Sequence, residues 1–317
     1  MPPPECAAME TVRAPWSSAS FLVYAGGLTV FGAVVSLLAV QSSDHGPGAF
    51  VLWALLVFVA VTASALAVRR RGHFVTAGLL ALSSVGAFVV LVGALLDWFG
   101  WLPHVSVGFK AFHFWVLVLE LVIVLAAAVA LRSFGFPLLV FLIAAASWYF
   151  VTDLISNGGD WSAVVTIFVG LVLLLVARGL DGRGSTVRAF WVHVTAGLTI
   201  GGGLLWFFHE GDLDWALVAL AGLIYVGLGD RFVRSSWVVL GAWGFLQSAA
   251  HYADKWSKAS FFVPYLFPFT VFDEYGGESS HEWAGPLVFV VAGSILILIA
   301  LLIARRRRTV IPAAELL

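Results

Sequence analysis

Long apolar segments alternate with short polar ones along almost the whole chain. Ten of the apolar segments have the character of membrane-spanning helices, which need about 20 mostly apolar residues. They are residues 21–40, 49–68, 75–96, 111–131, 136–152, 161–177, 189–208, 215–229, 235–252 and 285–304. The pattern predicts an all-α fold, a polytopic transmembrane helical bundle of about ten spans. A tail of residues 1–20 precedes this 21–304 domain, and a basic tail of residues 305–317 follows it.

One polar segment, residues 253–284, is much longer than the others. It contains the aromatic run "FFVPYLFPFTVF", residues 261–272, which is too short to cross a bilayer and is interrupted by Pro264 and Pro268. Backbone that is not helical is tolerated at membrane depth only inside protein or beside water. We therefore expect this run to form an interfacial or re-entrant segment.

The charges predict an orientation for these spans. Lys and Arg collect in cytoplasmic loops, and fourteen of the seventeen basic residues lie in the two tails and the even-numbered loops. These are Arg13, Arg69, Arg70, Arg71, Arg132, Arg178, Arg183, Arg188, Arg231, Arg234, Arg305, Arg306, Arg307 and Arg308. Twelve of the eighteen acids lie in the odd-numbered loops. Both termini are predicted to be cytoplasmic, and loop 253–284 is predicted to face outside.

Composition agrees with a membrane location. The chain is 61% hydrophobic and 11% charged, whereas soluble domains are about 25% charged. We expect a multi-pass protein of a bacterial-type plasma membrane, with the lipid bilayer and other membrane proteins as partners. The net charge of −1 indicates no nucleic-acid partner. The single cysteine, Cys6, excludes an internal disulfide, and no cofactor is predicted.

Glu120 is the most unusual residue of the predicted spans, because it places a carboxylate well inside segment 111–131. An acid in the middle of a bilayer costs about 2.5–3.5 kcal/mol, so Glu120 is expected to face the bundle interior. His113 precedes it by seven residues on the same helical face. A path from outer water past His113 to Glu120 is one interpretation. A neutral Glu120 that only bonds a neighbouring helix is the other.

Three more polar residues are candidates for the same intramembrane site. Thr199 lies at a similar depth in segment 189–208, and Gln247 and His251 lie four residues apart on one face of segment 235–252. In segment 189–208, Gly197 and Gly201 have the G-x-x-x-G spacing that lets helices approach closely. Helix packing is the favoured interpretation of these glycines, and a broken helix that lines a substrate site is the alternative.

Histidines and acids also gather in the predicted outer loops. Imidazole and carboxylate groups together suit Zn²⁺ or a pH-sensitive cluster, although these residues are scattered over several loops. They are His45, His209, Glu210, His281 and Glu282. Because the sequence does not bring them together, no metal site is predicted.

Motifs of catalysis give no support for an enzyme. "GLGD", residues 227–230, matches the G-x-G-D of presenilin-like intramembrane aspartyl proteases. Two aspartates must share one site in those enzymes, and the Tyr-Asp dipeptide of the second is missing here. The match is judged a coincidence. Neither H-E-x-x-H nor G-x-S-x-G nor a phosphate-binding loop occurs.

Weak internal sequence similarities suggest a duplication in which the two copies have the same orientation in the membrane. "AGGLTVFGA" (25–33) is similar to "TAGLTIGGG" (195–203), and "LRSFGFPLLVF" (131–141) to "VRSSWVVLGAW" (233–243). In hydropathy, the chain resembles the drug/metabolite transporter superfamily. Copies separated by an even number of helices have the same orientation, whereas the two repeats of that superfamily have opposite orientations. The part from "FWVHVTAGLTIGGGLLWFF" (190–208) onward resembles uncharacterised bacterial multi-span membrane proteins.

Two functions remain as hypotheses. The first is a small transporter or permease whose polar centre includes Glu120. The alternative is a non-transporting accessory or scaffold protein that docks partners through its outer loops.

Overall fold

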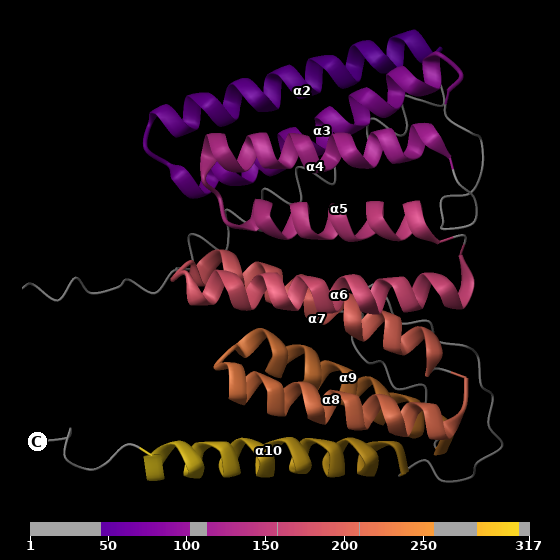
Figure 1. Cartoon of the computed structure of the whole chain (residues 1–317), viewed down its shortest axis with the longest axis vertical. Coiled ribbons are helices and arrows are strands. Elements are labelled where there is room, and N and C mark those ends of the chain that lie inside the picture. The colour runs from indigo at the N-terminus through magenta and orange to yellow at the C-terminus, as the bar shows by residue number, and fades with distance from the viewer. Residues whose placement is uncertain (1–45, 102–112, 157, 209, 257–283, 311–317) are drawn as a thin grey trace, which may run out of the picture. The chain divides into compact units, whose positions relative to one another are not determined.

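The computed structural model describes residues 46–101, 113–156, 158–208, 210–256 and 284–310, and the regular elements in these ranges are all α-helices (Figure 1). They are α2 (Pro47–Arg70), α3 (Phe74–Trp98), α4 (Phe114–Phe134), α5 (Leu138–Ile155), α6 (Gly159–Gly182), α7 (Thr186–Phe207), α8 (Asp212–Phe232), α9 (Ser235–Trp256) and α10 (Ala284–Val310). The all-α prediction is confirmed for this part of the chain.

Each helix from α2 to α10 overlaps one of the predicted spans, and the ends differ by a few residues. The first predicted span, 21–40, and most of loop 253–284 lie outside the described residues. Seven helices, α2 to α8, are long and apolar enough to cross a bilayer. Helix α9 is more polar, and the apolar part of α10 is the shorter stretch Leu287–Ile303. The described residues therefore give seven strong spans, and the count of about ten stays a prediction.

The helices group into two compact units. In unit 1, α3 packs against both α2 and α4, and the first part of α5 completes the core. Phe136, in the turn before α5, lies against Gly78 of α3, where an added Cβ would come within 2.3 Å of the Phe136 ring. A glycine is needed at this position because the aromatic ring occupies the space of a side chain.

Unit 2 contains two helical hairpins, α6–α7 and α8–α9, with α10 packed along α9 and the last part of α5 beside α6. The backbones of α8 and α9 meet at two glycines. A Cβ on Gly241 would lie 2.4 Å from the Gly222 carbonyl oxygen. Small residues permit this approach, as is common between membrane helices.

The two ends of unit 2 differ in charge. Helices α6 and α8 end, and α7 and α9 begin, at the end that carries the arginines; we call it the arginine-rich end. Its basic residues are Arg178, Arg183, Arg188, Arg231 and Arg234. At the opposite end, Trp206 of α7 donates to Asp160 of α6 at 3.0 Å. Between the ends, apolar side chains such as Phe168 and Leu175 are exposed, as expected for a surface in contact with lipid.

Candidate functional site

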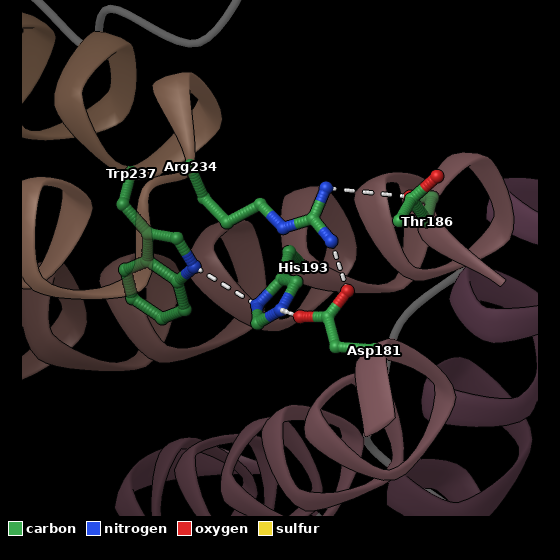
Figure 2. A network of polar contacts seen from close by, with 5 residues as sticks. All are labelled: Asp181, Thr186, His193, Arg234 and Trp237. Carbon is green, nitrogen blue, oxygen red and sulfur yellow. Dashed lines mark hydrogen bonds and ion pairs between the residues drawn. The ribbon is translucent and has the colours of Figure 1, made fainter. Parts of the chain in front are cut away.

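A network of polar side chains joins the two hairpins of unit 2 at the arginine-rich end (Figure 2). Asp181 comes from the last turn of α6, Thr186 and His193 from α7, Arg234 from the α8–α9 turn, and Trp237 from the first turn of α9. We call these five residues the arginine-end network. Since residues 12 to 53 positions apart meet in it, it depends on the tertiary fold.

Asp181 is the centre of this network. One carboxylate oxygen lies 2.9 Å from His193 Nε2, and the other accepts a hydrogen bond from the Arg234 guanidinium. Arg234 also donates to the Thr186 carbonyl at 3.3 Å. Both oxygens of Asp181 are thus engaged by partners, one from each hairpin.

His193 is completely buried, with 0% of its side chain exposed, and both of its ring nitrogens are bonded. The Trp237 indole nitrogen lies 3.1 Å from Nδ1. An indole N–H can only donate, so Nδ1 accepts and the imidazole proton resides on Nε2, which donates to Asp181. His193 is therefore neutral in this arrangement, between a donor on one side and a carboxylate on the other.

Aromatic rings surround the buried part of the network. Trp237 is 1% exposed, and the centre of its ring lies 4.8 Å from the centre of the Tyr225 ring and 6.1 Å from that of the Phe232 ring. The guanidinium carbon of Arg178 lies 4.5 Å from the centre of the Phe232 ring, which is within the range of a cation–π contact. The aromatic rings give His193 apolar surroundings on the side of α8.

The turn that positions Arg234 is strained. Val233 adopts the left-handed conformation, with φ 54° and ψ 43°, and no other non-glycine residue in the described ranges has a positive φ. A β-branched residue is unfavourable there. The Arg234 N–H bonds to the Gly229 carbonyl at 2.9 Å and closes the turn. Strained backbone often accompanies functional sites.

The chemistry available to the network depends on these contacts. Asp181 and Arg234 carry opposite charges, and His193 is neutral with no free lone pair to attack a substrate. The arrangement therefore does not resemble a nucleophile–base pair. Ionisable groups inside membrane segments mark functional sites by default, and His193 is the residue of this network whose side-chain type ordinarily titrates closest to neutral pH.

Glu120, the main sequence candidate, belongs to unit 1. It is 5% exposed and lies on the same face of α4 as Leu117 and Ala127, which are also buried. The side chain of Glu120 is therefore buried within unit 1, which is compatible with the expectation that it avoids lipid. Since α4 begins at Phe114 rather than at residue 111, Glu120 lies only about 9 Å along the helix. His113 is half-buried and occupies the N-cap position of α4.

The other candidates lie in unit 2 and have separate surroundings. Thr199 is buried and donates to carbonyls of its own helix, those of Thr195 and Ala196, both at 3.0 Å. His251 lies 3.4 Å from Asp212 at the opposite end from the network. Gln247 is half-buried on α9. No contact among those described brings these three side chains into one site.

The two candidate packing glycines differ from each other. A Cβ on Gly197 would lie 2.6 Å from a Leu240 methyl group, and the Gly197 carbonyl accepts a bond from Tyr225 at 3.1 Å. A Cβ on Gly201 would make only an ordinary contact of 3.6 Å with Tyr225. The close approach therefore involves Gly197.

Most of the outer histidine–acid set lies outside the described residues. This applies to His45, His209, His281 and Glu282, whereas Glu210 is exposed before α8. Among the described residues, no three His, Cys, Asp or Glu side chains are grouped to bind a metal.

Three side chains of the network, those of Asp181, His193 and Trp237, were not predicted from the sequence. A signal was present, because His193 is an ionisable residue inside a predicted span and Asp181 is an acid among the arginines of its loop. What the sequence lacked was the pairing of these residues across two hairpins.

The length and apolar composition of the helices define the class: the chain is an integral membrane protein with several helices able to span a bilayer. Neither a protein-family model nor a curated protein matches the sequence.

Proposed function

We propose that the protein is a small-solute permease of a bacterial-type plasma membrane, with the arginine-rich end of unit 2 in the cytoplasm. In this proposal, Glu120 binds a proton or a cation during transport. The orientation rests on the positive-inside rule and on the arginines that lie at one end of unit 2.

The observation that carries the proposal is the burial of Glu120 in α4, a helix apolar enough to span the membrane. A buried carboxyl group is costly there, and such groups in membrane segments commonly mark substrate or proton pathways. A neutral carboxyl group costs less than a charged one, so Glu120 can exchange a proton when its surroundings change. That exchange is the chemistry that a proton-coupled permease requires.

The test is a flux measurement on the purified full-length chain in proteoliposomes that contain a pH-sensitive dye. A pH gradient is imposed, and pools of amino acids, sugars and organic cations are added in turn. We expect one pool to stimulate proton movement in the wild type. Glu120→Gln should abolish this movement with normal expression, because Gln preserves the shape and hydrogen bonding but cannot titrate.

Asp160→Asn is the matched control, since it makes the same chemical change at an exposed acid and should transport normally. Normal flux in Glu120→Gln would show that Glu120 is not the coupling group. Absence of stimulated flux with every pool in the wild type would contradict a permease and favour the accessory or scaffold role.

A further inference from the structure

The bond between His193 and Trp237 is the feature of the arginine-end network that a proton can abolish. Trp237 donates to Nδ1 at 3.1 Å, and both side chains are almost fully buried. A proton bound to Nδ1 would point at the indole N–H, so two donors would face each other with no acceptor between them. The Trp237 bond and a charged His193 are therefore mutually exclusive.

We propose that His193 and Trp237 form a proton-released latch between the α6–α7 and α8–α9 hairpins. When a proton binds to Nδ1, the imidazole becomes a cation, the bond to Trp237 is lost, and the two hairpins separate locally at the arginine-rich end. This inference goes beyond the proposed function, because it concerns a conformational change that is independent of transport.

The charges around His193 determine what a proton does to the network. Asp181 and Arg178 come from α6 and Arg234 from the α8–α9 turn, and α8 contributes the uncharged Phe232 ring. Burial of the His193 side chain opposes the charged imidazole most strongly, and the nearby guanidinium groups of Arg234 and Arg178 also oppose it. The Asp181 carboxylate favours the charged imidazole. Once bound, a proton adds a second positive charge next to Arg234, and the two cations repel each other. The Arg234–Asp181 pair is weakened at the same time, whereas the bond from Tyr225 to the Gly197 carbonyl, another polar link between the hairpins, does not depend on this proton.

The apolar contacts indicate where the separation occurs. Trp237 remains packed against Tyr225 and Phe232 of its own hairpin, and α8 and α9 are in backbone contact at Gly222 and Gly241. The α8–α9 hairpin is thus internally tight. The displacement is expected between Trp237 and His193, with α8 and α9 moving together.

The experiment measures a distance between the two hairpins by double electron–electron resonance. Cys6, the only cysteine, is replaced by Ser, and spin labels are attached at Val187→Cys on α7 and Val239→Cys on α9, both exposed positions. We expect one short distance at about pH 8 and a growing longer component as the pH falls to about 5, the range in which histidine titrates.

Two variants test the mechanism. His193→Gln cannot gain the proton, so the longer component should not increase at low pH. Trp237→Phe lacks the donor, so the longer component should already be present at about pH 8. A label pair at Ile224→Cys and Val239→Cys, inside the α8–α9 hairpin, is the control and should not respond to pH. An unchanged wild-type distance across this pH range would overturn the proposal, as would the wild-type response in His193→Gln.

Discussion

The α4–α5 turn of unit 1 and the α8–α9 turn of unit 2 have the same framework. In each unit, the guanidinium group of an arginine near the C-terminus of one helix lies over a phenylalanine ring. That phenylalanine is the last residue of another helix of the same unit. Arg69 lies 5.4 Å from the centre of the Phe134 ring, and Arg178 lies 4.5 Å from that of Phe232. The next residue is left-handed in both turns, Gly135 with φ 67° in unit 1 and Val233 with φ 54° in unit 2.

Beyond this shared framework, the two turns differ in strain and in the contacts of the next residue. In unit 1, Gly135 adopts its conformation without strain, and the Phe136 ring packs on Gly78. In unit 2, a strained Val233 precedes Arg234, and the network around Asp181 takes the place of apolar packing.

This difference separates a turn held by apolar packing from one held largely by polar contacts. A packed ring such as that of Phe136 stabilises a turn without making its stability depend on pH or salt. A buried polar network often contributes less stability than apolar packing would, and its best-attested use is as a specificity device or a switch. The sequence similarity between residues 131–141 and 233–243 aligns Phe134 with Ser236 rather than with Phe232, so the parallel between the turns does not follow its register. The duplication stays a prediction.

The largest expected effect tests whether unit 2 depends on its polar network. Asp181→Ala removes the carboxylate that accepts hydrogen bonds from both His193 and Arg234, so both side chains lose this partner. Breaking a buried ion pair costs about 3–5 kcal/mol. Because Asp181 is 25% exposed, we expect the lower end, about 3 kcal/mol. The free energy of unfolding in mixed micelles, followed by denaturant titration, measures it.

The control for this change is Asp160→Ala, at an exposed acid that accepts one bond from Trp206. It should cost no more than about 1 kcal/mol. Equal losses of unfolding free energy in the two variants would mean that the arginine-end network contributes no more stability than a surface contact. The energetic difference between the two turns would then be disproved.

A smaller effect is expected from exchanging the left-handed residues. Val233→Gly should stabilise the protein by about 1 kcal/mol, because glycine adopts this conformation without a Cβ penalty. Gly135→Val should destabilise it by a similar amount through the strained backbone, because a Cβ there meets no atom within 4 Å. Thermal unfolding of both variants provides the comparison. A loss of stability in Val233→Gly would show that the valine side chain, despite its strain, makes a favourable contact.

The sequence predicted the helices well for a simple physical reason. A bilayer requires about 20 apolar residues per span, and this requirement is visible in each segment by itself. The ends were less accurate, as α4 shows. The predicted span begins at residue 111, whereas α4 begins at Phe114 with His113 as its N-cap residue, and Glu120 therefore lies closer to that end than predicted.

The arginine-end network was not predicted because it depends on pairs of residues far apart in the chain. Trp237 and His193 are 44 residues apart, and nothing in either segment alone indicates the other. Counting arginines predicted an orientation but treated Arg234 as one more positive charge, although its partner Asp181 lies in the preceding arginine-bearing loop. An acid in such a loop and a histidine in the adjacent span are the features to search for in similar chains.

The most direct test of the central claim, that a proton-sensitive bond joins the hairpins of unit 2, is a double-mutant cycle of His193→Leu and Trp237→Phe at two pH values. Hydrogen bonds between membrane helices contribute about 0.6–1 kcal/mol. We predict a coupling free energy of this size at about pH 8 and a value near zero at about pH 5, because a proton bound to Nδ1 removes the bond to Trp237. The same coupling at both pH values, or none at the higher one, would contradict the account.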